Sequence, residues 1–186
     1  GIKKNETEAC NYLKNAIDKG SVDAINQYGL MLKNGQGIEK DESEACQYFK
    51  AAIEKGSTEA MNQYGLMLKN GQGVEKDESE ALHYFKMAAD KGHADGMFNY
   101  AQMLKEQEND PEKTKEACHY FQLAADKGHV ESMYIFAMMN DEGIDTKIDK
   151  ETALKYYKKA SNKGHIESMY KCGIMSYKGE GTKMDK

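Results

Sequence analysis

The sequence predicts an all-α solenoid built from helix-turn-helix repeats. The twelve residues NQYGLMLKNGQG stand at 26–37 and again, unchanged, at 62–73, so the sequence repeats with a period of 36 residues. Helix-forming residues dominate, Pro111 is the only proline, and no alternation of apolar and polar residues persists long enough to predict a strand. A period of this length is typical of stacked helix pairs.

The period continues without insertion through five copies, which predicts ten helices. The repeats can be phased as 1–36, 37–72, 73–108, 109–144 and 145–180, with a stub of a sixth at 181–186, so that 1–186 is a single repeat array. One repeat cannot bury its apolar faces alone, so the copies are expected to stack around one continuous core. The clearest columns are Tyr12, Tyr48, Tyr84, Tyr120 and Tyr156, and Gly20, Gly56, Gly92, Gly128 and Gly164.

The first helix of each repeat, here named helix A, is clearest in the second copy. Asp41 followed by Glu44 predicts an N-cap with an acidic residue three positions later. Apolar residues then recur at i, i+3, i+4 and i+7 from Ala45 to Ala52, which is the stripe of an amphipathic helix. Gly56 is expected to end helix A in a left-handed conformation.

The second helix, helix B, is expected at about 58–69 in the same copy, and the glycines of NGQG end it. The fourth connection, residues 106–117, lacks both glycines. Asp110 and Pro111 there predict an N-cap followed by proline at N1, so that this helix A begins earlier. One column of helix B holds only small residues, which predicts close helix packing there: Gly29, Gly65, Ala101, Ala137 and Gly173.

These residues resemble the Sel1-like repeat (SLR) family, whose repeat of 36 to 44 residues is related to the tetratricopeptide repeat. The stretch EACQYFKAAIEKGSTEAMNQYGLMLKNGQGVEKDESEA at 44–81 carries the resemblance, which extends over the whole chain. The Leu-Gly common in helix B of the family is replaced here by Tyr64-Gly65. The resemblance implies a right-handed α/α superhelix with helices A on its concave face. It also implies a scaffold or adaptor role in protein–protein interaction.

The composition excludes several classes of function. Charged residues make up 31% with a net charge of −5, which argues against nucleic acid as a partner because no basic excess is present. No apolar run approaches the roughly 20 residues of a membrane span. The four cysteines are too scattered for a disulfide framework and indicate free thiols in a reducing compartment, the cytoplasm. The sequence begins with Gly1 rather than Met, which leaves an upstream signal open.

The sequence predicts no catalytic residue, no metal site and no cofactor site. The G-x-G pairs, such as Gly35 and Gly37, follow a helix rather than a strand, so we expect helix-ending turns and not phosphate binding. Three histidines occupy one column, which spaces them about 10 Å apart, too far to share one zinc ion. They are His93, His129 and His165.

The face of helix A opposite its apolar stripe is the candidate binding site. Residues there lie about 140° to 200° from the stripe, and they either form a solvated surface or line the groove that the resemblance implies. A groove with a row of lysines would bind an acidic or amide-rich peptide. The predicted groove residues are Asn11, Gln47, His83, His119 and Lys155, and Lys14, Lys50, Lys86, Gln122 and Lys158.

Two further surfaces are candidates. An aromatic column of helix B, made of Phe98, Tyr134 and Tyr170, forms either a contact patch on the convex side or packing against neighbouring repeats. The fifth repeat keeps ordinary core residues, including Met169, so the array is expected to self-associate end to end.

The sequence therefore predicts a non-catalytic scaffold that binds a protein or peptide. One alternative is a structural spacer or regulatory module within a larger multidomain protein. The other is an enzyme or small-ligand receptor, such as the cysteine-rich relatives that have been linked to β-lactamase activity. Those relatives carry a cysteine pair in every repeat, whereas no repeat here has two. A site for chemistry also needs polar groups that converge without following the repeat, and every polar candidate named above recurs with it.

Overall fold

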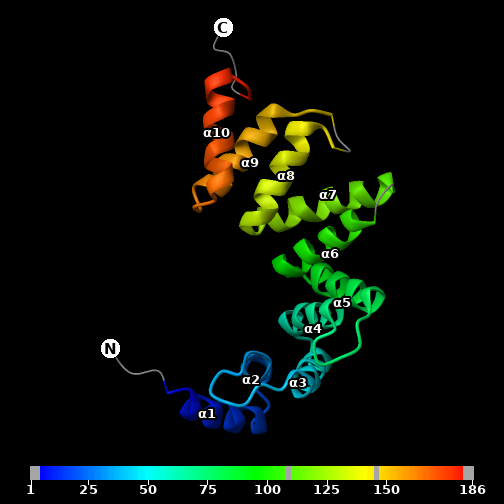
Figure 1. Cartoon of the computed structure of the whole chain (residues 1–186), viewed down its shortest axis with the longest axis vertical. Coiled ribbons are helices and arrows are strands. Elements are labelled where there is room, and N and C mark those ends of the chain that lie inside the picture. The colour runs from blue at the N-terminus through cyan, green and yellow to red at the C-terminus, as the bar shows by residue number, and fades with distance from the viewer. Residues whose placement is uncertain (1–4, 108–109, 145–146, 182–186) are drawn as a thin grey trace. The chain divides into compact units, whose positions relative to one another are not determined.

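The computed structural model describes residues 5–107, 110–144 and 147–181. These residues form ten α-helices and no strand, which confirms the predicted all-α repeat fold (Figure 1). The chain divides into two compact units, residues 1–91 and 92–186. Most of the predicted sixth-repeat stub at 181–186 lies outside the described residues.

The first unit contains five helices of equal length, each packed against the next. Helices A and B alternate, and short connections keep consecutive helices side by side (Figure 1). The helices are α1 (Glu6–Asp18), α2 (Val22–Asn34), α3 (Glu42–Glu54), α4 (Thr58–Asn70) and α5 (Glu78–Asp90).

Local capping explains where these helices begin and end. The side chain of Asp41 accepts a hydrogen bond from the Glu44 N–H at 2.8 Å, as the sequence predicts. Gly56 follows α3 with φ of 86°, and Gly71 ends α4 with φ of 67°, a conformation that costs glycine nothing. The predicted turns of the G-x-G pairs are thereby confirmed as helix ends.

The core of the first unit depends on glycine in helix B. A Cβ atom on Gly65 would lie 2.7 Å from Cε1 of Phe85, and one on Gly29 would lie 2.9 Å from Cε1 of Phe49. Both phenylalanines are fully buried. The small-residue column therefore marks the place where the aromatic ring of the following helix A packs against the helix B backbone.

The second unit repeats the arrangement with one longer helix. Asp110 caps it through the N–H groups of Glu112 and Lys113, and Pro111 stands at its first position, so the predicted early start is confirmed. The helices are α6 (Ala94–Glu106), α7 (Pro111–Asp126), α8 (Val130–Glu142), α9 (Lys150–Ser161) and α10 (Ile166–Lys178).

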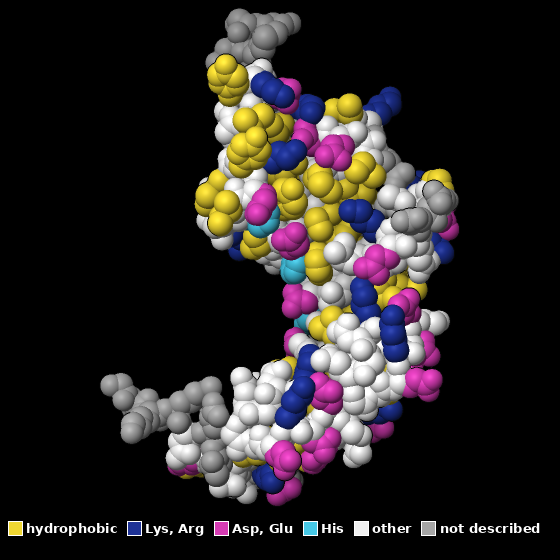
Figure 2. Space-filling model, in the orientation of Figure 1, with side chains coloured by type: hydrophobic (Ala, Val, Ile, Leu, Met, Phe, Trp, Pro, Cys, Tyr) yellow, Lys and Arg dark blue, Asp and Glu magenta, His cyan; other side chains and the backbone are white. Residues whose placement is uncertain are grey.

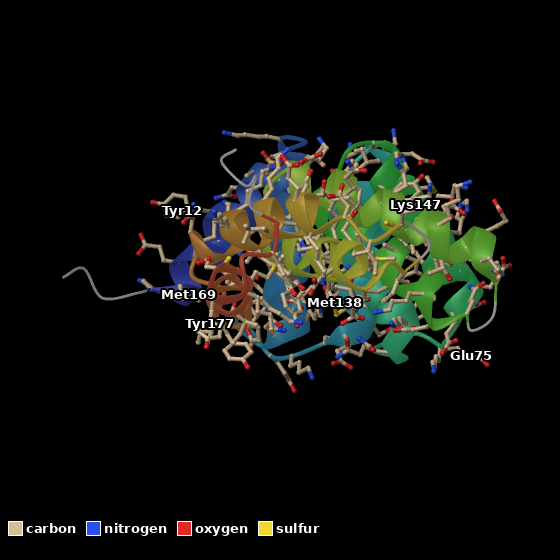
Figure 3. All side chains as sticks on the ribbon, turned by 90° about the horizontal axis from the view of Figure 1, so that it is seen from above. Tyr12, Glu75, Met138, Lys147, Met169 and Tyr177 are labelled. Carbon is tan, nitrogen blue, oxygen red and sulfur yellow. The ribbon has the colours of Figure 1, made fainter. Side chains whose placement is uncertain are left out.

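The last helix of this unit exposes residues whose counterparts are buried elsewhere. Met169 on α10 is 47% exposed, whereas Met133 and Met61 in the same column are buried. Apolar side chains gather over α8 to α10 in the space-filling view (Figure 2). Met169 and Tyr177 extend away from α10 (Figure 3). The exposed large apolar residues of this helix are Ile166, Met169, Tyr170 and Tyr177.

Candidate functional site

The predicted groove residues are all exposed on the outer side of helix A. In the first unit they lie on α1, α3 and α5, and in the second unit on α7 and α9. The exposed residues are Asn11, Lys14, Gln47, Lys50, His83 and Lys86 in the first unit, and His119, Gln122, Lys155 and Lys158 in the second.

The lysines of the first unit rest on tyrosine rings of helix B. The ammonium nitrogen of Lys14 lies 5.5 Å from the ring centroid of Tyr28, and that of Lys50 lies 5.1 Å from the centroid of Tyr64. A hydrogen bond to the Tyr64 hydroxyl raises the pKa of Lys50, which keeps this side chain positively charged. Two members of the row, Lys14 and Lys50, therefore lie over aromatic rings of the neighbouring helix.

Those tyrosines pack in turn on the tyrosine column of helix A. The rings of Tyr28 and Tyr48 lie 4.8 Å apart between centroids, and those of Tyr64 and Tyr84 lie 5.0 Å apart. Burial raises the pKa of Tyr84. The exposed face thus combines lysine side chains with the half-buried tyrosine rings of helix A.

In the second unit, tyrosine hydroxyl groups on the same face form hydrogen bonds with acidic side chains. The Tyr100 hydroxyl donates to Oε1 of Glu116 at 3.0 Å. The Tyr156 hydroxyl donates to Oδ1 of Asp126 at 2.7 Å, and Lys159 donates to the same oxygen at 3.3 Å. Burial, followed by the hydrogen bond to Asp126, raises the pKa of Tyr156 to about 12.

A pocket that the sequence analysis missed opens on this face of the second unit. Its volume is 410 Å³, and α7, α8 and α9 contribute its walls. Two predicted groove residues, His119 and Gln122, line it together with Phe136, Asn140 and Thr152. The sequence does show that several of these residues differ from the other members of their repeat columns. It does not show that these positions lie close together in space.

The aromatic column of helix B divides into packed and exposed members. Phe98 is half-buried, and its ring lies 4.5 Å from that of His129. Tyr134 is half-buried 4.7 Å from the ring of His165. Tyr170 is 68% exposed. The two inner members therefore pack against the following repeat, and only Tyr170 among the three offers most of its ring to solvent.

The histidine column supplies N-caps of helix B, a role that the sequence analysis did not predict. Nδ1 of His129 accepts a hydrogen bond from the Ser132 N–H at 3.1 Å, and its Nε2 lies 3.7 Å from Asp95. Burial lowers the pKa of His129, partly opposed by the Asp95 carboxylate. In the first unit, serine occupies the same position, as at Ser57.

The described residues contain no group of three or more histidine, cysteine or acidic side chains that could hold a metal ion. Within the same part of the chain, no helix combines the length and apolar character that crossing a membrane requires. All four cysteines are free thiols, three of them buried.

The family model of the Sel1 repeat matches residues 1–21, 22–57, 58–93, 94–129, 130–165 and 166–186. The chain therefore belongs to the Sel1 repeat family. The matched segments keep the 36-residue period but begin between helix A and helix B, half a repeat away from the repeats predicted from the sequence. Proteins of this family are generally non-enzymatic scaffolds that mediate protein–protein interaction.

Solved structures of other Sel1 repeat proteins have a similar fold. A protective antigen of uropathogenic Escherichia coli strains with an SLR fold has a TM-score of 0.80 and 20% identity, over 95% of this chain and 38% of that protein. A Sel1 repeat protein from Oxalobacter formigenes has a TM-score of 0.77 and 24% identity, over 98% of this chain and 78% of that one. The chain thus spans well under half of the antigen. No curated protein matches the sequence.

Proposed function

We propose that this chain is a scaffold or adaptor that binds a protein or peptide carrying acidic groups on the exposed face of its helices A. The observation that carries the proposal is the lysine row of the first unit, in which Lys14 and Lys50 are held over tyrosine rings. Side chains that are positioned before binding lose less conformational freedom when a partner binds. The charge favours a carboxylate-bearing partner.

The variation of residue type along the exposed face of helices A supports binding of a specific partner rather than non-specific binding. The first groove column changes from amide to imidazole to ammonium along the chain, whereas the buried alanine columns do not change. The family's general role in protein–protein interaction supports the same conclusion. Free thiols support a cytoplasmic location, which we propose with it.

The experiment is affinity capture from a lysate of the source organism with a triple variant, Lys14→Glu, Lys50→Glu and Lys86→Glu. The matched control changes Lys19, Lys55 and Lys91 to Glu, because these exposed residues follow the same helices with the same 36-residue spacing and give the same net charge. Circular dichroism establishes that both variants fold.

Partners captured by the parent and the control but lost by the groove variant would support the proposal. Equal loss of captured partners in the groove variant and in the control variant would show that the effect depends only on net charge. Equal capture by all three proteins would move the contact away from the lysine row. Capture of nothing by any of them would favour the alternative of a structural spacer in a larger protein.

A further inference from the structure

The repeat pattern is interrupted at four positions that meet in space, at the junction of the fourth and fifth repeats. Each position keeps one residue type in the preceding repeats and a different, uncharged one here. Lys14, Lys50 and Lys86 become Gln122; Tyr28, Tyr64 and Tyr100 become Phe136; Leu32, Leu68 and Leu104 become Asn140; Glu44, Glu80 and Glu116 become Thr152.

At other junctions, some of the residues that are replaced here contact one another. In the first unit the ammonium of Lys50 lies on the ring of Tyr64, and the nearby Glu80 carboxylate helps to raise the pKa of Lys50. In the second unit the hydroxyl of Tyr100 donates to Glu116 at 3.0 Å. At these junctions, lysine or glutamate of helix A therefore contacts a buried tyrosine of helix B.

At the junction of the fourth and fifth repeats these contacts are absent, and a pocket is found at the equivalent position. Phe136 has no hydroxyl, Thr152 has no carboxylate, and Gln122 has no charge. The pocket of 410 Å³ is lined by all three and by Asn140, Cys118 and His119. This volume is within the range of about 300 to 1,000 Å³ that is usual for small-ligand sites.

The polar groups of the pocket present hydrogen-bond acceptors. Asn140 uses an N–H of its amide to bond the Phe136 carbonyl at 2.8 Å, and this bond does not engage its side-chain oxygen. Gln122 and Thr152 each add a side-chain oxygen that can accept a hydrogen bond. These acceptor oxygens favour a ligand that donates hydrogen bonds.

The charge of the residues that line the pocket favours a neutral hydrogen-bond donor over a cationic one. Its lining contains no acidic side chain, and Lys115 is the lining residue that carries a fixed charge, which is positive. A cationic donor such as an ammonium group would meet this charge without a counterion. A neutral carboxamide supplies two N–H donors to the acceptors and an oxygen that can accept from Lys115 or His119.

We propose that this pocket binds the carboxamide of an asparagine or glutamine side chain in a peptide that lies on the helix A face of the second unit. Phe136 supplies an apolar floor for the methylene groups. The inference rests on the proposed function for the surrounding peptide, but the pocket itself can be tested with a small probe.

The test is a titration of the intact chain, followed by proton–nitrogen correlation spectra, with N-acetyl-glutamine N-methylamide. Analogues with glutamate, lysine and norleucine serve as comparison. We expect the glutamine probe to bind in the millimolar range and to shift the side-chain amide signals of Gln122 and Asn140. The intact junction around Lys50 and Tyr64, in the same molecule, is the internal control and should not respond.

A consensus variant provides the second arm: Gln122→Lys, Phe136→Tyr, Asn140→Leu and Thr152→Glu. It restores the residues of the other repeats, so it is expected to fold, and it should weaken glutamine binding by about tenfold or more through the lost hydrogen bonds. The reverse graft, Lys50→Gln, Tyr64→Phe, Leu68→Asn and Glu80→Thr, should create a second responsive site in the first unit.

Several results would overturn the proposal. Stronger binding of the glutamate or lysine analogue would contradict the carboxamide assignment. Equal affinity for the glutamine probe in the consensus variant, measured from backbone amide shifts, would place the probe elsewhere. No shift with any probe would show that the pocket does not bind side chains. Because the capture experiment depends on the lysines of the first unit, it can succeed while this titration fails, so the two proposals are separable.

Discussion

The rings of Phe98 and His129 lie 4.5 Å apart between centroids and are inclined by only 32°, so the end of one repeat packs on the helix cap of the next. Tyr134 and His165 form the same pair one repeat later, at 4.7 Å. In the first unit the corresponding pair is polar, because Asn26 donates to Oγ of Ser57 at 2.6 Å. The two units therefore use different chemistry at one junction position.

This difference predicts that acid destabilises the chain through His129. Protonation of Nδ1 removes the acceptor that caps α8 and places an N–H against the Ser132 N–H. Burial lowers the folded-state pKa of His129 below its ordinary value. The unfolded state then binds more protons, so this stability is complete above the unfolded pKa of about 6.5 and is lost as the pH falls toward the folded pKa.

The measurement is denaturant unfolding at about pH 7.5 and about pH 5 for the parent and for His129→Ser, which introduces the cap of the first unit. We expect the variant to lose less stability on acidification, by about 1 kcal/mol. His119→Gln, at an exposed position, is the control. The same pH dependence in parent and His129→Ser would refute the role of this cap.

Two glycines in one column should respond to alanine with opposite signs. Gly65→Ala places a Cβ 2.7 Å from a buried Phe85 ring atom and should destabilise the protein by about 1 to 3 kcal/mol. Gly173→Ala meets no atom within 4 Å and should stabilise by about 0.5 to 1 kcal/mol through helix propensity. Thermal and denaturant melts of both variants measure this, and a shift of the same sign in both would contradict the packing described here.

Adjacent tyrosines on α9 give a second matched pair. The Tyr157 hydroxyl is buried and makes no hydrogen bond with the described residues, and phenylalanine holds its column at Phe49, Phe85 and Phe121. Tyr157→Phe should therefore raise the free energy of unfolding by about 1 kcal/mol. Tyr156→Phe removes the bond to Asp126 and should lower it by a similar amount, so equal losses in both would be inconsistent with an unsatisfied Tyr157.

The exposed face of α10 predicts self-association that depends on concentration. Met169→Glu combined with Tyr170→Glu should abolish it, because both side chains are exposed on that face. Tyr12→Glu on α1, where Tyr12 is 68% exposed, distinguishes contact between unlike ends from contact between two α10 faces. Tyr12→Glu should weaken self-association only if α1 of one molecule contacts α10 of another. A monomer at every concentration in sedimentation velocity would exclude both arrangements.

The local features of the fold could be predicted from the sequence because each depends on residues within a few positions of one another. Asp41 caps α3, Gly71 ends α4, and Pro111 begins α7 at the positions expected from side-chain capping and backbone conformation. The exposed face of helix A follows equally from helical periodicity. The period itself fixes which columns are buried.

Tertiary structure decided what the columns contact. Lys50 rests on Tyr64, fourteen positions away, and His129 packs on Phe98 from the preceding repeat. Gln122 and Thr152, thirty positions apart, line the same pocket. Such contacts depend on how each helix packs on its neighbour, and small rotations per repeat change them while the helical pattern stays the same. The sequence alone therefore determined the repeat, the helices and their outward faces, whereas only the packing of α7, α8 and α9 brought four scattered departures from the repeat into one pocket.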